Sequence, residues 1–348
     1  YLIQLEVEND PERVITIETN SLDESNPELP LMRNQAENVE DLTTLSHLNE
    51  PSVLNVIKLR YSQFNIYTYS GIVLIAVNPF QRNDELYSPY RIKRYANTRR
   101  GDEEPHLFAI AEEAYRCMIN RNQNQSIVVS GESGAGKTVS AKYIMRYFAT
   151  VDSDENQHDM SQTEKQILAT NPIMESFGNA KTTRNDNSSR FGKYLEILFD
   201  NKTVICGAKI RTYLLERSRL VFQPKTERNY HIFYQMIQGL DENTKKSIHL
   251  EDIESYNYLN QGGLPLIEGV DDSKEFQDTC NALSLVGIDE AKQLEIFKVL
   301  SGLLHLGNVD IPKTRNNASL SSDEPSLVKA CELLGLAPVS FAKWTVKK

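Results

Sequence analysis

The chain has 348 residues, a net charge of −10 and a hydrophobic content of 40%. These values are typical of a soluble globular protein with one large domain or two smaller ones. The acidic balance excludes a general nucleic-acid-binding surface, which needs a basic face to neutralise phosphates. The four cysteines are widely spaced, so neither a zinc site nor a disulfide framework is expected, and a reducing compartment fits. No apolar run reaches membrane-spanning length, and we expect no membrane insertion.

Residues 1–20 predict two short strands around a turn at Asn9-Asp10-Pro11. Two strands cannot enclose a core, so we interpret them as the end of a small β-module, in a chain cut from a longer protein. The polar, proline-containing residues that follow indicate a linker. We therefore expect a short first region, 1–32, and a main domain, 33–348.

Several further elements are expected before the most informative segment. Residues 50–61 have helical spacing, and the apolar run GIVLIAVNP (71–79) predicts a strand buried on both faces. Residues 105–121 predict a core-packed helix whose first position is Pro105. Residues 126–130 (SIVVS) predict a short buried strand.

A glycine-rich segment follows that predicted strand. GESGAGKT (131–138) matches the pattern G-x-x-x-x-G-K-[ST], and an amphipathic helix follows it. Glycines let successive backbone N–H groups turn inward, and with the helix N-terminus they form a concave anion site. Lys137 is expected to reach the β- and γ-phosphates, and the Thr138 hydroxyl to coordinate Mg²⁺. The expected binding residues are Gly131, Glu132, Ser133, Gly134, Ala135, Gly136, Lys137 and Thr138.

A second polar segment, TTRNDNSSRFGK (182–193), precedes a predicted strand at 194–199. A polar run alone is typical of a solvated loop. Because this one ends at Gly192 and leads directly into the sheet, its position should be fixed by the core. It is therefore a candidate to reach the γ-phosphate.

The two segments together resemble a known pair. GESGAGKT (131–138) and NDNSSRFGK (185–193) resemble the P-loop and switch I of a myosin motor head. The similarity extends from about Asp41 to Lys348 and is greatest to the class V (fungal-type) unconventional myosins. The other matching segments are NPFQRNDELY (78–87, the purine-binding loop), residues 167–185 (the helix leading into switch I) and residues 213–235 (the following strand and helix).

The resemblance implies an α/β fold, the P-loop NTPase core of a myosin motor head with large helical insertions. Residues 1–32 would then be the C-terminal end of a small SH3-like β-barrel and a linker. Residues 33–348 would be the N-terminal portion of the motor domain. No D-x-x-G-F-E motif, the family's switch II, is present in the sequence.

The resemblance also implies a role for each site residue. Phosphoryl transfer needs positioning and charge stabilisation, and the implied catalytic residues are Ser188, Arg190 and Lys137. Ser188 would contact the γ-phosphate and the attacking water, and Arg190 would pair with a switch II glutamate. The implied Mg²⁺ ligands are Thr138 and Ser189. The other implied nucleotide contacts are Ser133 and Asn185 at the phosphates and Asn78, Pro79, Arg82 and Tyr87 at the base.

The implied function is the Mg-ATP-binding part of an actin-based motor ATPase in intracellular cargo transport. The implied cofactors are ATP and Mg²⁺. The implied partners are actin filaments, calmodulin-like light chains and cargo adaptors, mostly through regions downstream of this chain, with no direct nucleic-acid contact. The expected location is the cytoplasm, at the actin cytoskeleton. Without switch II, the 348 residues are not expected to be catalytically competent alone.

The residues themselves leave two alternatives open. One is another P-loop nucleoside triphosphatase, such as a kinesin-like motor or a small-molecule kinase, although a kinesin-like chain would have histidine where Arg190 stands. The other is a nucleotide-binding module without motor activity. A guanine-specific site is disfavoured, because the one Asn-Lys pair, Asn201-Lys202, lacks the following Asp and predicts a plain hairpin turn.

The rest of the chain is expected to be mainly helical. The acidic segment at 151–162 predicts a surface loop. The other expected elements are a three-strand region at 194–216 and helices at 226–239, 274–286, 289–304 and 323–334.

Overall fold

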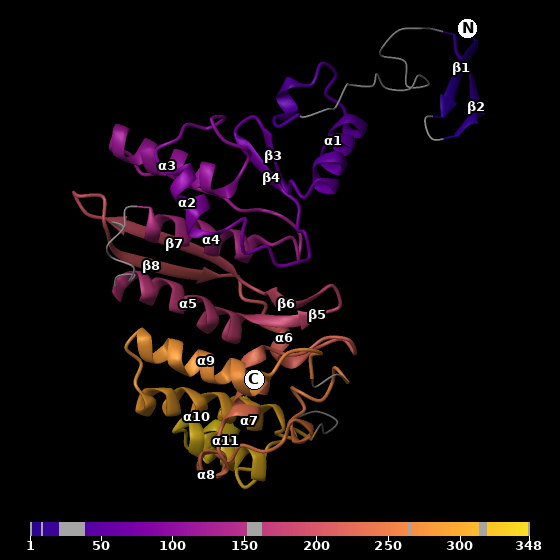
Figure 1. The fold of residues 1–348 in the computed structure, drawn as a ribbon. Coiled ribbons are helices and arrows are strands. Elements are labelled where there is room, and N and C mark those ends of the chain that lie inside the picture. Colours follow the sequence, from indigo (N-terminus) through magenta and orange to yellow (C-terminus); the bar gives the residue numbers. More distant parts are fainter. Residues whose placement is uncertain are drawn as a thin grey trace. The chain divides into compact units, whose positions relative to one another are not determined.

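The computed structural model describes residues 2–7, 10–20, 39–151, 162–263, 266–312 and 319–346. The chain divides into two compact units, Tyr1–Gln125 and Ser126–Lys348 (Figure 1). The predicted linker, with the boundary at 32/33, and most of the predicted acidic loop lie outside the described residues.

The described residues of the first unit form two antiparallel strand pairs and three α-helices. As predicted, the chain begins with a strand pair, β1 (Leu2–Val7) with β2 (Asp10–Glu18). The predicted helix at 50–61 is confirmed as α1 (Glu50–Ser62), whose N-cap Asn49 accepts a hydrogen bond from the backbone N–H of Ser52. The remaining elements are a 3-10 turn at Leu42–Thr44, β3 (Tyr67–Ser70), β4 (Val73–Ala76), α2 (Pro89–Tyr95) and α3 (Leu107–Arg121).

The strand predicted at 71–79 exists, but its predicted burial on both faces is wrong. It is shortened to β4, which pairs antiparallel with β3. Among the described residues β3 is its one strand neighbour, so β4 lies at the edge of a two-stranded sheet. Ile72 and Val73 are consequently exposed to 90% and 55%.

The predicted helix at 105–121 is confirmed as α3, although it starts at Leu107 instead of Pro105. The reason is the imidazole of His106, which caps the helix. Its Nδ1 accepts a hydrogen bond from the backbone N–H of Phe108 at 3.0 Å, and its Nε2 lies 3.1 Å from the carbonyl oxygen of Leu86. Burial lowers the pKa of His106 from 6.5 to about 3, so the ring is neutral and Nε2 carries the proton.

In the second unit a strand hairpin packs between two helices. α4 (Lys137–Thr150) and α5 (Gln162–Gly178) flank β7 (Gly192–Phe199) and β8 (Ile205–Tyr213) (Figure 1). Met145, Ile167 and Ile205 form the buried centre of this layer.

The region at 194–216 contains two strands, β7 and β8, and the predicted third strand is wrong. The turn between β7 and β8 confirms the plain hairpin predicted at Asn201-Lys202. There the Asp200 carboxylate accepts hydrogen bonds from the backbone N–H groups of Lys202 and Val204.

The short buried strand predicted at 126–130 is not formed. These residues make no strand ladder with the described part of the chain, and Val128 is 88% exposed. A run of β-branched residues gains a strand conformation only when a neighbour satisfies its N–H and C=O groups. The apolar composition alone therefore overpredicted this element.

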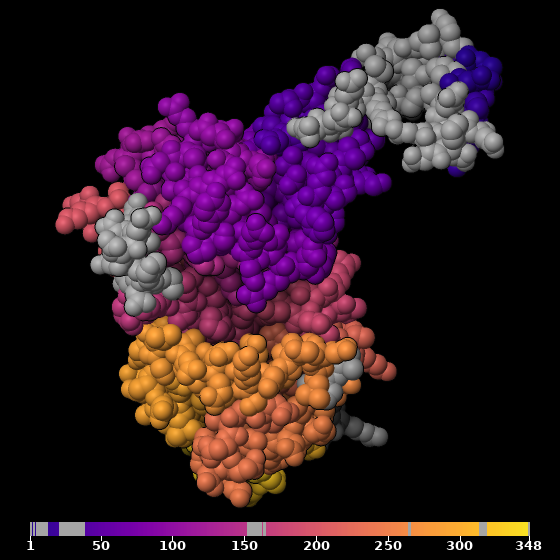
Figure 2. Space-filling view, viewed as in Figure 1, coloured from indigo at the N-terminus to yellow at the C-terminus, as the bar shows by residue number. Residues whose placement is uncertain are grey.

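The C-terminal part is a helical cluster, as predicted, and its orange and yellow atoms lie together in the space-filling view (Figure 2). The helices are α6 (Ser218–Val221), α7 (His231–Gly239), α8 (Glu242–Ser247), α9 (Asp272–Leu285), α10 (Glu290–Gly307), α11 (Pro325–Leu334) and α12 (Pro338–Thr345), with a 3-10 turn at Ile253–Ser255. The core of the cluster is built from α7, α9 and α10 around Ile232, Phe276 and Leu304.

The helix predicted at 226–239 begins only at His231, because side chains hold the preceding residues outside it. Asn229 donates hydrogen bonds to the carbonyl oxygens of Leu220 and Tyr258, and Arg228 forms an ion pair with Asp272 at 2.9 Å.

The mixture of helices and small sheets agrees with the expected α/β class. Within the described residues, no single helix has both the length and the apolar composition to cross a bilayer. α11 and α12 meet that criterion only when combined, and they are bent by 112° relative to each other.

Candidate functional site

The glycine-rich loop runs into α4 with backbone angles that favour glycine. Gly134 and Gly136 have φ values of 82° and 92°, in the left-handed region. A Cβ at Gly134 would lie 3.8 Å from Cβ of Asn185, so the loop passes close to the turn that ends β5 (Asn179–Thr182) and begins β6 (Asn185–Ser189).

The N-terminus of α4 has no side-chain cap. Its N-cap is Gly136, which has no side chain to accept a hydrogen bond from the first turn. The N–H groups of a first helical turn lack partners within the helix and carry the positive end of the helix dipole. This end of α4 therefore has the donor chemistry that an anion requires.

Lys137 is the first residue of α4, and its ammonium group bends back over the loop. Nζ donates hydrogen bonds to the carbonyl oxygens of Gly131 and Glu132 at 2.7 and 2.8 Å. The positive charge thus lies beside the loop, in the segment where the sequence predicts phosphate oxygens.

The β5–β6 hairpin brings the second polar segment to this loop. Residues 185–189 of that segment form β6, which pairs antiparallel with β5. The hydroxyl oxygens of Ser133 and Ser188 are 2.8 Å apart. Ser188 is 2% exposed, so its hydroxyl is fixed by these surroundings.

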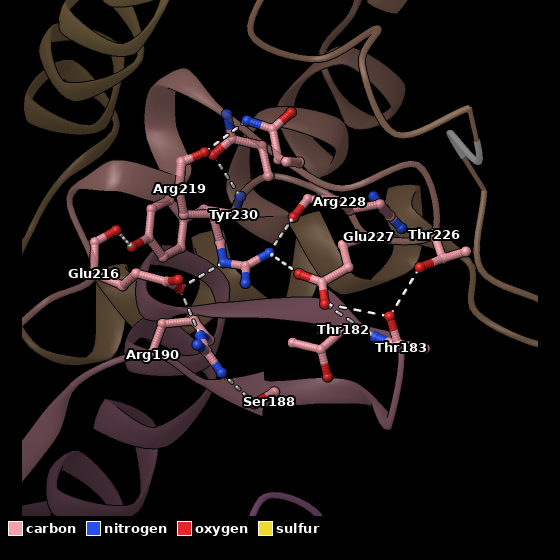
Figure 3. Close-up of polar contacts among 12 residues, drawn as sticks. Thr182, Thr183, Ser188, Arg190, Glu216, Arg219, Thr226, Glu227, Arg228 and Tyr230 are labelled. Atoms are coloured by element: carbon pink, nitrogen blue, oxygen red, sulfur yellow. Dashed lines mark hydrogen bonds and ion pairs between the residues drawn. The ribbon is translucent and has the colours of Figure 1, made fainter.

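Arg190 follows β6 and has a partner that the sequence did not predict. Its Nε donates to Oε2 of Glu216 at 2.7 Å, and its Nη1 donates to the Ser188 hydroxyl at 3.2 Å (Figure 3). Glu216 is thus a partner of Arg190 within this chain, and the expected pairing with a switch II glutamate stays a prediction.

The donor set near the loop fits a magnesium nucleotide. Thr138 lies in the first turn of α4 and Ser189 ends β6, and both are partly buried. Hydroxyl oxygens are hard ligands of the kind that Mg²⁺ takes together with phosphates and waters. In the described part of the chain the structure brings Ser133 to Ser188, whereas it gives no direct contact between Thr138 and Ser189. Those residues include no cluster of His, Cys, Asp and Glu that could hold a metal on its own.

The residues predicted to contact the base belong to the first unit. Asn78 Oδ1 accepts a hydrogen bond from the backbone N–H of Phe80 at 3.0 Å, and Arg82 pairs with Asp84 at 2.7 Å. The Tyr87 hydroxyl is 2.7 Å from that of Tyr67. Tyr87 also lies against the ring of His106, so it is packed within its own unit. The role of Asn78, Pro79, Arg82 and Tyr87 toward a base stays a prediction.

Sequence reasoning missed three charged residues around the hairpin, Glu216, Arg219 and Glu227. Arg219 Nε binds Glu216 at 2.7 Å and its Nη1 binds Glu227 at 2.8 Å (Figure 3). The signal available was a glutamate three residues before an arginine, Glu216 and Arg219, directly after a predicted strand.

Comparisons with known proteins identify the family of this chain. The family model described as myosin head (motor domain) matches residues 39–348. Myosin-2 of Lachancea kluyveri is 65% identical over 99% of this chain and 23% of its own length. Myosin-4 of Saccharomyces cerevisiae is 62% identical over 99% of this chain and 24% of its own length. Myosin-52 of Schizosaccharomyces pombe is 53% identical over 98% of this chain and 23% of its own length.

The chain spans about a quarter of the length of these relatives. The resemblance of residues 131–138 and 185–193 to a myosin head is confirmed at the level of the family, since the matched region includes both segments. The chain belongs to the myosin head (motor domain) family.

Proposed function

We propose that this chain supplies the Mg-ATP-binding part of an actin-based motor that hydrolyses ATP. The observation that carries the proposal is the hydrogen bond between Ser133 and Ser188, 2.8 Å long, which joins the glycine-rich loop to β6. A phosphate cradle alone would support binding. A second segment of hydroxyls and an arginine on the same cradle also supports cleavage of the terminal phosphate.

Each residue has a chemical task under this proposal. Lys137 and the N–H groups of the first turn of α4 bind the phosphates, while Thr138 and Ser189 supply hydroxyl oxygens for Mg²⁺. When bound, Mg²⁺ neutralises charge on the phosphate oxygens. Ser188, held between Ser133 and Arg190, orients the attacking water and accepts its proton for relay. Arg190 provides positive charge next to Ser188.

The finer assignments also belong to the proposal. Asn78, Pro79, Arg82 and Tyr87 would contact the purine, and the strands β1 and β2 would be the end of an SH3-like barrel. The class V, transport-type assignment rests on the similarity quoted from the sequence. Actin filaments, light chains and cargo adaptors would be partners of the full-length protein in the cytoplasm.

The test uses a full-length myosin that carries these 348 residues. Calorimetry should detect Mg-ATP binding, and phosphate release should be stimulated by actin filaments. The absence of Mg-ATP binding would overturn the nucleotide site. Binding and hydrolysis without any response to actin would overturn the motor assignment and favour a plain P-loop triphosphatase.

A further inference from the structure

The β5–β6 hairpin is attached to the segment between β8 and α7 at both of its ends. At the end of β6, Arg190 Nε donates to Glu216 Oε2 at 2.7 Å. At the turn between the strands, the Thr183 hydroxyl lies 2.8 Å from that of Thr226 and 3.3 Å from Oε1 of Glu227. The turn and the strand end are thus each held by side chains outside the hairpin (Figure 3).

Arg219 connects these two attachments. Its Nε donates to the same Glu216 oxygen that binds Arg190, and its Nη1 binds Glu227 Oε2. The Arg219 side chain is 5% exposed and that of Glu227 is 14% exposed. We call the three residues Glu216, Arg219 and Glu227 the clamp.

Backbone contacts fix the clamp itself. The N–H of Glu216 donates to the carbonyl oxygen of Arg190 at 2.9 Å, and the N–H of Arg228 donates to that of Lys181 at 3.1 Å. The Tyr230 hydroxyl donates to the Glu216 carbonyl oxygen at 2.6 Å. The chain at Gly262 lies directly against Glu227, where a Cβ would come within 1.9 Å of the Glu227 carbonyl oxygen. The clamp residues therefore have little freedom to move.

The charges of this network are balanced, with Arg190 and Arg219 facing Glu216 and Glu227. Burial by itself raises the pKa of Glu216, but the hydrogen bonds and charges of Arg190 and Arg219 outweigh it, so the net pKa lies below its usual value. Removing one carboxylate would leave a partly buried guanidinium without a counter-ion, which disturbs the remaining pairs.

We propose that Glu216, Arg219 and Glu227 are positioning residues that hold the β5–β6 hairpin, and with it Ser188 and Arg190, in register with the glycine-rich loop. Their effect on phosphate cleavage rests on the proposed function, whereas their effect on the hairpin does not. Within the described part of the chain, none of the three forms a hydrogen bond or ion pair with the glycine-rich loop. They act through Arg190 at one end and Thr183 at the other (Figure 3).

The first arm of the test needs no nucleotide. Glu216→Gln and Glu227→Gln keep the size of each side chain and remove its charge, so folding should survive where truncation of buried Arg219 could prevent it. The matched control is Glu251→Gln, which breaks the 2.6 Å ion pair with Lys329 in the helical cluster.

The readout of this arm is amide hydrogen exchange in a full-length myosin carrying this chain. Exchange of residues 179–190 should rise on the order of tenfold in both clamp variants, while β7 and β8 keep wild-type protection. Exchange unchanged from wild type, or raised equally in β7 and β8, would overturn the positioning role.

The second arm measures single turnovers of Mg-ATP. Glu216→Gln should slow cleavage on the order of tenfold while ATP affinity stays within about threefold, since the ion pair orients Arg190 without touching the ligand. In an Arg190→Ala background the same change should have no further effect, because the residue through which Glu216 acts is gone.

The two arms separate the two proposals. If the wild type neither binds nor cleaves Mg-ATP, the proposed function fails and the cleavage effect fails with it, while the exchange arm still decides the positioning role. If the wild type cleaves Mg-ATP and Glu216→Gln behaves like Glu251→Gln, the clamp has no part in catalysis. Additive losses in Glu216→Gln and Arg190→Ala would also contradict coupling through Arg190.

Discussion

The hydroxyl oxygens of Ser133 and Ser188 lie 2.8 Å apart, although one belongs to the glycine-rich loop and the other to a strand of a separate hairpin. This contact connects the segment suited to bind phosphate with the segment suited to act on it. The Ser188 hydroxyl also accepts a hydrogen bond from Arg190. One buried hydroxyl therefore contacts both Ser133 of the loop and Arg190, which follows β6.

The two serines should therefore differ when each is changed to alanine. Ser133→Ala removes the contact between the segments and the implied phosphate contact of Ser133. Ser188→Ala removes the contact between the segments, the acceptor of Arg190 and the group proposed to orient water. We expect Ser188→Ala to slow cleavage at least about tenfold more than Ser133→Ala, with an ATP affinity no weaker than that of Ser133→Ala. Single-turnover kinetics measures both quantities, and equal cleavage rates in the two variants would refute the special role of Ser188.

Lys137→Ala should abolish tight Mg-ATP binding and leave the fold intact. Among the described residues, its ammonium group donates to the carbonyl oxygens of Gly131 and Glu132 in an exposed setting, so its loss should cost less than about 1 kcal/mol of stability. The phosphates, by contrast, would lose their main counter-charge. Calorimetry with a Lys142→Ala control on the same helix checks this, because Lys142 pairs with Glu175 instead. Unchanged affinity in Lys137→Ala would disprove the site.

ATP should be preferred over GTP. The Asn201-Lys202 pair forms an ordinary hairpin turn and offers no carboxylate to a guanine base. Competition between the two nucleotides in a cleavage assay measures the preference, and other purine triphosphates should be accepted less well than ATP. A strong preference for GTP would contradict the motor assignment.

Arg190→Ala should separate binding from chemistry. Arg190 lies behind Ser188 and reaches Glu216, so its removal should leave ATP binding within about tenfold, roughly 1.4 kcal/mol. Cleavage should slow on the order of a hundredfold or more. Arg184→Ala, in the exposed hairpin turn, is the matched control. If Arg190→Ala weakened ATP binding and left the cleavage rate unchanged, Arg190 would instead contact the phosphates of bound ATP before cleavage.

Exchanging the charges of Arg190 and Glu216 should not restore cleavage. In Arg190→Glu combined with Glu216→Arg, the new guanidinium at position 216 would face Arg219, which now binds Glu216 at 2.7 Å. Like charges at that distance repel, so cleavage should stay as slow as in Arg190→Ala. Recovery of the wild-type cleavage rate in single-turnover measurements would contradict this, because it would show that Arg219 does not need the Glu216 carboxylate for cleavage.

Burial of His106 should make the protein acid-sensitive. Its pKa falls from 6.5 to about 3 on folding, so between these values the unfolded state binds more protons than the folded state. The free energy of unfolding should therefore decrease as the pH falls through this window, by up to about 1.4 kcal/mol per pH unit. Urea unfolding at pH 7 and pH 5 should show a smaller loss for His106→Asn, which keeps an N-cap oxygen, than for wild type or a His47→Asn control. An equal loss in all three would exclude His106 as the source.

The sequence predicted elements well where a local signal determined them. The apolar spacing at 50–61 predicted the helix, and the polar Asn201-Lys202 pair predicted the hairpin turn. The structure adds the local contacts that stabilise them, the N-cap Asn49 and the turn acceptor Asp200. Apolar composition was less informative. Residues 126–130 look like a buried strand, but a strand also needs a partner, and no property of the run itself supplies one.

The same limit applies to the site. The glycine pattern and the serines of β6 were visible in the sequence because their spacing carries the chemistry. Glu216 and Glu227 were not, since each is important only through Arg219 and the hairpin it faces. The order of residues does not reveal which carboxylate an arginine selects in the folded protein.

The close approach of Gly262 to Glu227 has a consequence for mutational scans of this gene. Any side chain at position 262 would collide with the carbonyl oxygen of Glu227, which must then shift its backbone. Substitutions at 262 should consequently share the phenotype of clamp variants, although the position carries no functional group. In a selection for motor activity, a glycine far along the sequence from the phosphate loop would then score as intolerant as the residues that bind Arg219.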